Sequence, residues 1–201
     1  MIYRMHPSVY EFQKFLLDGD TIEEAMGEEC WIHFDARPTR YADNWVSIEL
    51  AFYDAITESE HTTKLIPDLI SNSIGQMFVS EKAQHLLAPV LGECGEWLPI
   101  TYLGKKGYLL NVLNLAEDYD AIDKTQIQRD HDGLIKVAFD EAKLGEYVIF
   151  RTEEDCYRGI YCSDAVKAII DKHKLQGCTL TAGLAELAHG TGQICVKMDA
   201  A

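Results

Sequence analysis

Residues 78–87 read FVSEKAQHLL, and residues 161–170 read YCSDAVKAII. In each stretch two apolar residues precede a serine and an acid, and apolar side chains then recur at helical spacing. A serine followed by an acid favours a helix start, because the hydroxyl can accept hydrogen bonds from free backbone amides and the carboxylate lies at the positive end of the helix dipole. The pattern predicts two units in which a short strand runs directly into a helix, at residues 76–91 and 160–174.

A hairpin is predicted between these two units. Apolar runs at residues 97–103 and 108–115 flank the sequence Gly104-Lys-Lys-Gly107, and glycines in a short connection are typical of a hairpin turn. Further short strands are expected at residues 134–139, 147–151 and 178–181. Because the predicted strands cluster together instead of alternating with helices, the expected fold class is α+β, with a mainly antiparallel sheet and flanking helices.

The N-terminal part gives a different pattern. A Ser8-Val-Tyr-Glu11 capping box predicts a helix over residues 8–18, and a short acidic helix should follow and end near Gly27. Residues 30–36 are expected to form a strand, and residues 45–53 to be extended. Irregular composition at residues 67–75 suggests a boundary between an N-terminal α/β subdomain, residues 1–75, and an α+β domain, residues 76–201, packed together as one unit.

The composition is that of a globular protein. Apolar residues make up 47% and charged residues 25% of the chain, and no apolar run approaches the roughly 18 residues that cross a bilayer. The start of the chain lacks the charged, apolar and small-residue order of a signal peptide. We therefore expect a cytoplasmic protein without membrane association, in which the six cysteines stay reduced.

Charge is the strongest compositional feature. Thirty-three acids against eighteen bases give a formal net charge of −15, which disfavours binding to nucleic acid. Residues 18–29 hold six acids and no lysine or arginine, and residues 117–132 and 153–155 are also acid-rich. Such patches suit a basic protein partner, because complementary fields speed encounter. Acidity that serves only solubility is the alternative.

No catalytic, metal-binding or cofactor-binding residue is predicted. Cys162 precedes a helix start, where a cysteine can be activated as a nucleophile, but the equivalent residue of the first unit is Val79. A residue that packs in the core at the end of a strand explains both Cys162 and Val79, so Cys162 is expected to be a packed strand cysteine. The sequence Arg129-Asp-His-Asp-Gly133 lacks the paired histidines of a metal site and reads as a polar turn. Two alternatives stay open: a small-molecule or protein-modifying enzyme with Cys162 as nucleophile, and a self-associating structural or regulatory module.

Six short motifs follow one another between residues 65 and 180. They are Val79-Ser80, Leu98-Pro99-Ile100, Asn111-Val112-Leu113 with Asp120-Ala121-Ile122-Asp123, Ile149-Phe150-Arg151, Cys162-Ser163 with Lys167, and Leu175-Gln176-Gly177. In this order they resemble a family of bacterial immunity proteins from polymorphic-toxin systems, formerly catalogued as a domain of unknown function. Cys162 departs from the family's pattern, which has valine there. The first 60 residues and the tail after Ala188 lie outside the resemblance.

The resemblance implies stoichiometric binding rather than catalysis. An immunity protein protects its producer by occupying the active site, or another essential surface, of a cognate toxin encoded by an adjacent gene. A cytoplasmic inhibitor implies a toxin that acts in the cytoplasm, and the acidity of this chain favours a basic nuclease. A homo-oligomer is compatible with this role.

Two acidic segments that contain a tyrosine are the predicted toxin-binding residues. They are Glu153, Glu154, Asp155 and Tyr157, on a turn between two predicted strands, and Asp118, Tyr119 and Asp120. Aromatic side chains ringed by charge are typical of tight interfaces. The alternative, that both segments are simply solvated loops, stays open.

Overall fold

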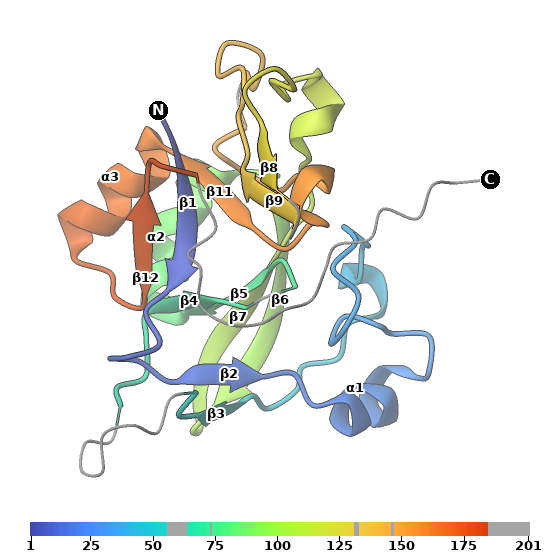
Figure 1. Cartoon of the computed structure of the whole chain (residues 1–201). Coiled ribbons are helices and arrows are strands. Elements are labelled where there is room, and N and C mark those ends of the chain that lie inside the picture. The colour runs from blue at the N-terminus through green and yellow to red at the C-terminus, as the bar shows by residue number, and fades with distance from the viewer. Residues whose placement is uncertain (56–63, 73, 131–132, 146, 185–201) are drawn as a thin grey trace.

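Two antiparallel sheets form the framework of the chain (Figure 1). The computed structural model describes residues 1–55, 64–72, 74–130, 133–145 and 147–184. The central sheet comprises, in spatial order, β4 (Leu69–Ser71), β5 (Gln76–Ser80), β7 (Lys105–Val112) and β6 (Gly95–Tyr102). The second sheet comprises β10 (Ile149–Phe150), β11 (Ile160–Ser163), β1 (Ile2–Pro7) and β12 (Cys178–Thr181).

The central sheet is buried on both faces. Successive side chains of a strand point to opposite faces, so Phe78 and Leu109 belong to one core cluster and their neighbours Met77 and Leu110 to another. The predicted hairpin is confirmed, because β6 and β7 pair along their full length around a turn at Gly104. Both of its strands therefore contribute to two cores at once.

Two helices and the second sheet cover one face of the central sheet. α2 (Glu81–Leu91) packs on β5 and β7, α3 (Asp164–His173) packs on β1 and β11, and the two helices contact each other (Figure 1). Their shared core joins Leu87 of α2, Val166 of α3, Met5 of β1 and Leu110 of β7. Residues from both ends of the described chain thus stabilise one core.

The N-terminal segment covers the opposite face. It comprises β2 (Lys14–Leu16), α1 (Gly19–Met26), the 3₁₀ helix η1 (Ala42–Asn44) and β3 (Ala51–Tyr53), with β2 and β3 paired. Ile22 of α1 and Ile32 are fully buried, in the same cluster as Phe78 and Leu98 of the central sheet. The predicted acidic helix is confirmed, and it ends at Gly27.

The remaining elements lie beside the second sheet. They are the 3₁₀ helix η2 (Ala116–Tyr119), the paired strands β8 (Gln128–Asp130) and β9 (Gly133–Lys136), and the 3₁₀ helix η3 (Glu153–Asp155). A third core cluster joins Ala116 of η2 to Phe150 of β10 and Tyr161 of β11. This cluster fixes the position of η2 relative to the second sheet.

Both predicted strand–helix units are confirmed, since β5 runs into α2 and β11 into α3 without a loop. Ser80 caps α2 as expected, because its Oγ accepts a hydrogen bond from the Ala83 N–H at 3.2 Å. Ser163 occupies the N-cap position of α3, but within the described residues its hydroxyl makes no hydrogen bond. The expected side-chain cap is therefore wrong for Ser163.

Two N-terminal predictions are wrong. Residues 8–18 are not a helix, because β1 ends at Pro7, β2 begins at Lys14, and the Ser8 hydroxyl lies 2.9 Å from Thr179 Oγ1 instead of capping a helix. Residues 30–36 form turns instead of a strand. In both segments, pairing and packing with distant parts of the chain override the local pattern.

The α+β fold class is confirmed. Both large sheets combine strands from before and after residue 75, and the division into two subdomains stays a prediction. In the described part of the chain, no helix is long and apolar enough to span a membrane.

The cysteines differ in state. Cys30, Cys94, Cys162 and Cys178 are free thiols, as expected. Cys156 is disulfide-bonded, so the expectation of reduced cysteines is wrong for that residue. The remaining cysteine, Cys195, lies outside the described residues.

Candidate functional site

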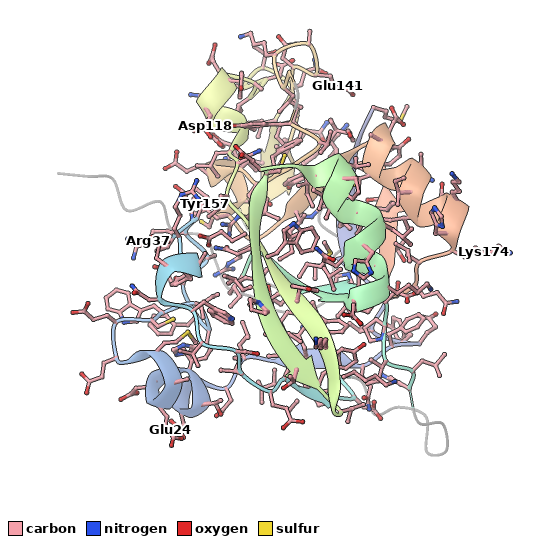
Figure 2. The ribbon with its side chains drawn as sticks, turned by 180° about the vertical axis from the view of Figure 1, so that it is seen from behind. Glu24, Arg37, Asp118, Glu141, Tyr157 and Lys174 are labelled. Atoms are coloured by element: carbon pink, nitrogen blue, oxygen red, sulfur yellow. The ribbon has the colours of Figure 1, made fainter. Side chains whose placement is uncertain are left out.

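The two predicted toxin-binding segments lie side by side. Leu115 and Arg151 form a parallel bridge, in which the Arg151 N–H donates to Asn114 O at 2.9 Å and the Ala116 N–H donates to Arg151 O at 3.0 Å. η2 follows the first strand of this bridge and η3 follows the second. Residues 118–120 and 153–157 are therefore brought together by backbone hydrogen bonds between distant segments. Figure 2 shows residues 118 and 157 at the same edge of the molecule.

Glu117 joins the two segments through its side chain. Its Oε1 accepts hydrogen bonds from Thr152 Oγ1 at 2.6 Å and from the Glu153 N–H at 2.9 Å. Thr152 in turn caps η3, because its Oγ1 accepts from the Glu154 N–H at 3.1 Å. Glu117 is not among the predicted site residues. Its role depends on a contact between distant segments, and only the acidic composition of residues 117–132 pointed to it.

Asp118, Tyr119 and Asp120 are exposed at the end of η2. The Tyr119 ring is 46% exposed and stands edge-on to the Tyr147 ring at 4.6 Å, which holds it in place. Asp120 forms an ion pair with Lys143 at 2.9 Å, and this hydrogen bond lowers the pKa of the Asp120 carboxyl. The segment thus presents an aromatic ring between two carboxylates.

Glu153 is exposed beside this segment, and Tyr157 is half-buried. Burial, and then the Glu153 carboxylate, raises the pKa of the Tyr157 phenol. Tyr157 follows Cys156, and both have left-handed backbones, with φ of 62° and 57°, which turn the chain sharply after η3. We call the surface formed by Asp118, Tyr119, Asp120, Glu153 and Tyr157 the η2–η3 face.

The other two predicted residues point into the chain. Glu154 is 8% exposed and Asp155 is 3% exposed. Asp155 Oδ2 accepts hydrogen bonds from the Gly159 N–H at 2.9 Å and from the Tyr161 hydroxyl at 2.7 Å. Glu154 pairs with Arg129. The two carboxylates therefore hold η3 in place and are too buried to contact a partner directly.

The geometry around Cys162 does not suit a nucleophile. The residue is fully buried within the core shared by α2 and α3, and burial raises the pKa of its thiol to about 12. A nucleophilic cysteine instead needs an accessible thiolate. Among the described residues no group of three or more His, Cys, Asp or Glu side chains is placed to hold a metal ion. His131 and Asp132 of the predicted polar turn lie outside the described residues.

Comparison with curated proteins finds no match. A family model, by contrast, matches residues 37–183, which contain both strand–helix units, the hairpin and the whole η2–η3 face. The family is described as an immunity protein family, in agreement with the resemblance of residues 65–180. Because the match spans most of the sequence, the chain belongs to the immunity protein family Imm11.

Proposed function

We propose that the protein neutralises a cognate bacterial toxin by direct, stoichiometric binding, and that the η2–η3 face contacts the toxin. The family gives the general role in toxin immunity. The observation that carries the binding mechanism is the exposed Tyr119 ring between Asp118 and Asp120, with Glu153 and Tyr157 beside it. Aromatic side chains next to charged groups are the usual anchors of protein interfaces.

The toxin surface that fits this face is basic. The chain carries a net charge of −15, and three of the five residues of the η2–η3 face are acids. Lysine or arginine side chains of a partner can form charge-assisted hydrogen bonds with these carboxylates and can stack on the tyrosine rings. Inhibition then needs no reaction by this protein, only occupation of a surface that the toxin uses.

A cytoplasm-acting nuclease is the toxin class that this chemistry favours. Nucleases need a basic surface, because they must bind the phosphates of nucleic acids. An acidic inhibitor competes for that surface. The proposal places the encounter in the cytoplasm, where a nuclease meets its substrate.

Co-expression tests the proposal. The toxin encoded by the adjacent gene is expressed in a laboratory bacterium with and without this protein, and complex formation is followed by size-exclusion chromatography. The proposal predicts restored growth and a stable complex of fixed stoichiometry. Restored growth without a complex would contradict binding and indicate an enzyme that reverses the damage. Continued growth arrest by a demonstrably active toxin would contradict immunity for that pair.

A further inference from the structure

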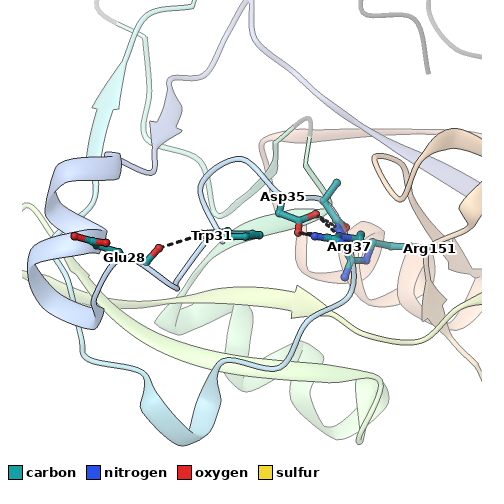
Figure 3. A network of polar contacts seen from close by, with 6 residues as sticks. Glu28, Trp31, Asp35, Arg37 and Arg151 are labelled. Atoms are coloured by element: carbon teal, nitrogen blue, oxygen red, sulfur yellow. Dashed lines mark hydrogen bonds and ion pairs between the residues drawn. The ribbon is translucent and has the colours of Figure 1, made fainter. Parts of the chain in front are cut away.

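The connection between α1 and η1 is a long loop that side chains of β6, of β7 and of the residue after β10 hold in one position. We call residues 28–41 the α1–η1 loop. Three polar side chains fasten it. Arg151 Nη1 donates to Ala36 O at 2.7 Å, Asn111 Nδ2 donates to Thr39 O at 2.8 Å, and the Glu96 carboxylate accepts from the Tyr41 N–H at 2.9 Å. Figure 3 shows Arg151 close to Asp35 and Arg37 of this loop.

These fastening groups are costly to bury. Arg151 and Asn111 are fully buried and Glu96 is 8% exposed. Burial lowers the pKa of Arg151 to about 10, and its Nε and Nη2 have no hydrogen-bond partner within the described part of the chain. Apolar side chains in such positions stabilise a core at least as well as buried polar groups do. The three polar groups therefore contribute little to the stability of the core, and their effect is to fix the conformation of a loop that has no regular structure.

The fixed loop displays two aromatic rings. Trp31 is 47% exposed and Phe34 is 58% exposed, and their rings stack with centroids 5.9 Å apart. The Trp31 Nε1–H donates to Glu28 O at 2.8 Å, so the indole is held by the loop itself (Figure 3). Ile32, between them, is fully buried and anchors the loop to the core. Large aromatic side chains exposed on a rigid support are typical of interaction sites.

The segment that leads into the loop is acidic. A shallow depression of about 440 Å³ is lined by Asp20, Glu23, Glu24, Gly27 and Glu28, and Trp31 is linked to it by its hydrogen bond to the Glu28 backbone oxygen. The first lysine or arginine after residue 18 is Arg37, and the Asp35 carboxylate binds it at 2.7 Å. His33 lies between the two aromatic residues, with its ring edge-on to Phe34 at 4.5 Å. In Figure 2, Glu24, Arg37, Tyr157 and Asp118 lie along one edge of the molecule. The loop thus continues the η2–η3 face towards α1.

We propose that Trp31 and Phe34 are the apolar anchor of the toxin interface, and that the carboxylates of α1 bind basic side chains of the toxin beside it. This inference rests on the proposed function and adds a second contact region to it. A basic partner follows from the charge around the rings, because a cationic surface is attracted to the acidic depression. Trp31 and Phe34 precede the residues that the family model matches, so the shared family pattern does not account for their exposure.

The double variant Trp31→Ala/Phe34→Ala tests the anchor in the full chain, with the cognate toxin as ligand. We expect the Kd of the complex to rise about 100-fold or more, mainly through faster dissociation, since the variant loses both aromatic anchors of the proposed contact region. The urea unfolding midpoint should stay close to that of the wild type, because both rings are exposed. Tyr10→Ala is the matched control. Tyr10 is 63% exposed between β1 and β2, and its loss should change the Kd less than twofold.

The outcomes separate the two proposals. If the wild-type chain forms no complex with an active toxin, the proposed function fails. If the wild-type chain binds and the double variant binds equally well, the anchor is wrong while the proposed function stands. Should the double variant unfold, Phe34→Ala replaces it, because that side chain is more exposed and carries no polar atom. An unchanged Kd for folded Phe34→Ala would equally overturn the anchor.

Discussion

Asp155 is the acid on which the position of η3 depends. Its carboxylate accepts from Gly159 and Tyr161, and Arg4 Nη2 lies 3.9 Å from the same oxygen. Asp155→Asn keeps the size of the side chain but removes the charge that these donors face. We expect it to lower the free energy of unfolding by about 2–3 kcal/mol, because a buried hydrogen-bonded charge is replaced by a poorer acceptor. Urea denaturation measures the change.

Glu153→Gln is the matched control for this prediction. Glu153 belongs to the same short 3₁₀ helix, but its side chain is exposed. Its substitution should change the free energy of unfolding by less than about 0.5 kcal/mol. Equal losses for the two variants would show that Asp155 has no special role in holding η3.

These two residues also show what composition can predict. The sequence predicts that Glu153-Glu154-Asp155 lies between two strands, and the structure has it between β10 and β11, but the three acids are equivalent in the sequence. Asp155 points inward because of Tyr161 on β11 and Arg4 on β1, and Glu154 because of Arg129 on β8. Those partners come from strands that pair through the tertiary fold, so no local pattern could identify them.

At the scale of the element, the two strand–helix units offer a matched comparison. Ser80 Oγ accepts from the Ala83 N–H, whereas Ser163 Oγ makes no hydrogen bond within the described residues. Ser80→Ala should therefore lower the free energy of unfolding by about 1 kcal/mol, the usual value of an N-cap. Ser163→Ala should change it by less than about 0.5 kcal/mol, since no bond is lost. Equal losses in denaturant titrations of the two variants would contradict this difference.

β1 is the element whose stability should respond most to mild acid. His6 lies on this strand, and its Nε2 is 2.9 Å from Thr181 Oγ1 on β12. Burial, and then the nearby Arg4, lowers the pKa of His6 from 6.5 to about 4. His6 therefore binds a proton more readily in the unfolded chain than in the folded one. The folded chain keeps the full stabilisation from neutral His6 above pH 6.5 and loses it as the pH falls towards 4.

His6→Gln tests this dependence, because an amide can keep the contact with Thr181 but does not titrate. Between pH 7 and pH 4.5 we expect the free energy of unfolding to fall by about 1–2 kcal/mol more in the wild type than in the variant. The difference is limited because the His6 ring is partly hydrated in the folded chain. The free energy of unfolding is measured by urea titration at both pH values. Parallel losses in the two proteins would show that His6 is not the group responsible.

The elements that the sequence predicted correctly are those specified locally. The boundaries of α2 follow from Ser80 at its start and Gly92 after its end, both within the helix's own segment. Residues 8–18 carry an equally good local helix signal, yet they contain β2, which pairs with β3, and the Ser8 hydroxyl contacts Thr179 on β12. These contacts with distant segments outweigh one capping box, and none of them is visible from the segment itself.

For the whole molecule, the structure brings the two predicted segments together, and their role in toxin binding stays a prediction. Residues 118–120 and 153–157 form one face only because Leu115 pairs with Arg151. The α1–η1 loop was predicted to contain a strand, since its residues are bulky and apolar. Its observed conformation depends on Arg151, Asn111 and Glu96, which are remote from it in sequence. Such non-local contacts are the part of the fold that periodicity cannot show.

The charge of the whole chain makes a prediction about the rate of binding. A net charge of −15 should attract a basic toxin at long range, and salt should screen this attraction, since the Debye length is about 10 Å at 0.1 M salt. If the η2–η3 face meets the toxin, reversing an acid on it should slow association more than reversing an acid on the far side of the molecule. Glu153→Lys is the test, because Glu153 is exposed on that face.

Asp171→Lys is the matched variant, since it changes the net charge of the chain equally. Asp171 lies on α3, and Figure 2 shows that the C-cap of this helix, Lys174, is across the molecule from Asp118 and Tyr157. In stopped-flow measurements at low salt we expect Glu153→Lys to reduce the association rate constant about fivefold and Asp171→Lys less than twofold. At about 0.5 M salt the association rate constant of the wild type should fall towards that of Glu153→Lys, because salt screens the local attraction. Equal slowing by both variants would mean that only net charge steers the encounter, and the η2–η3 face would then have no part in it.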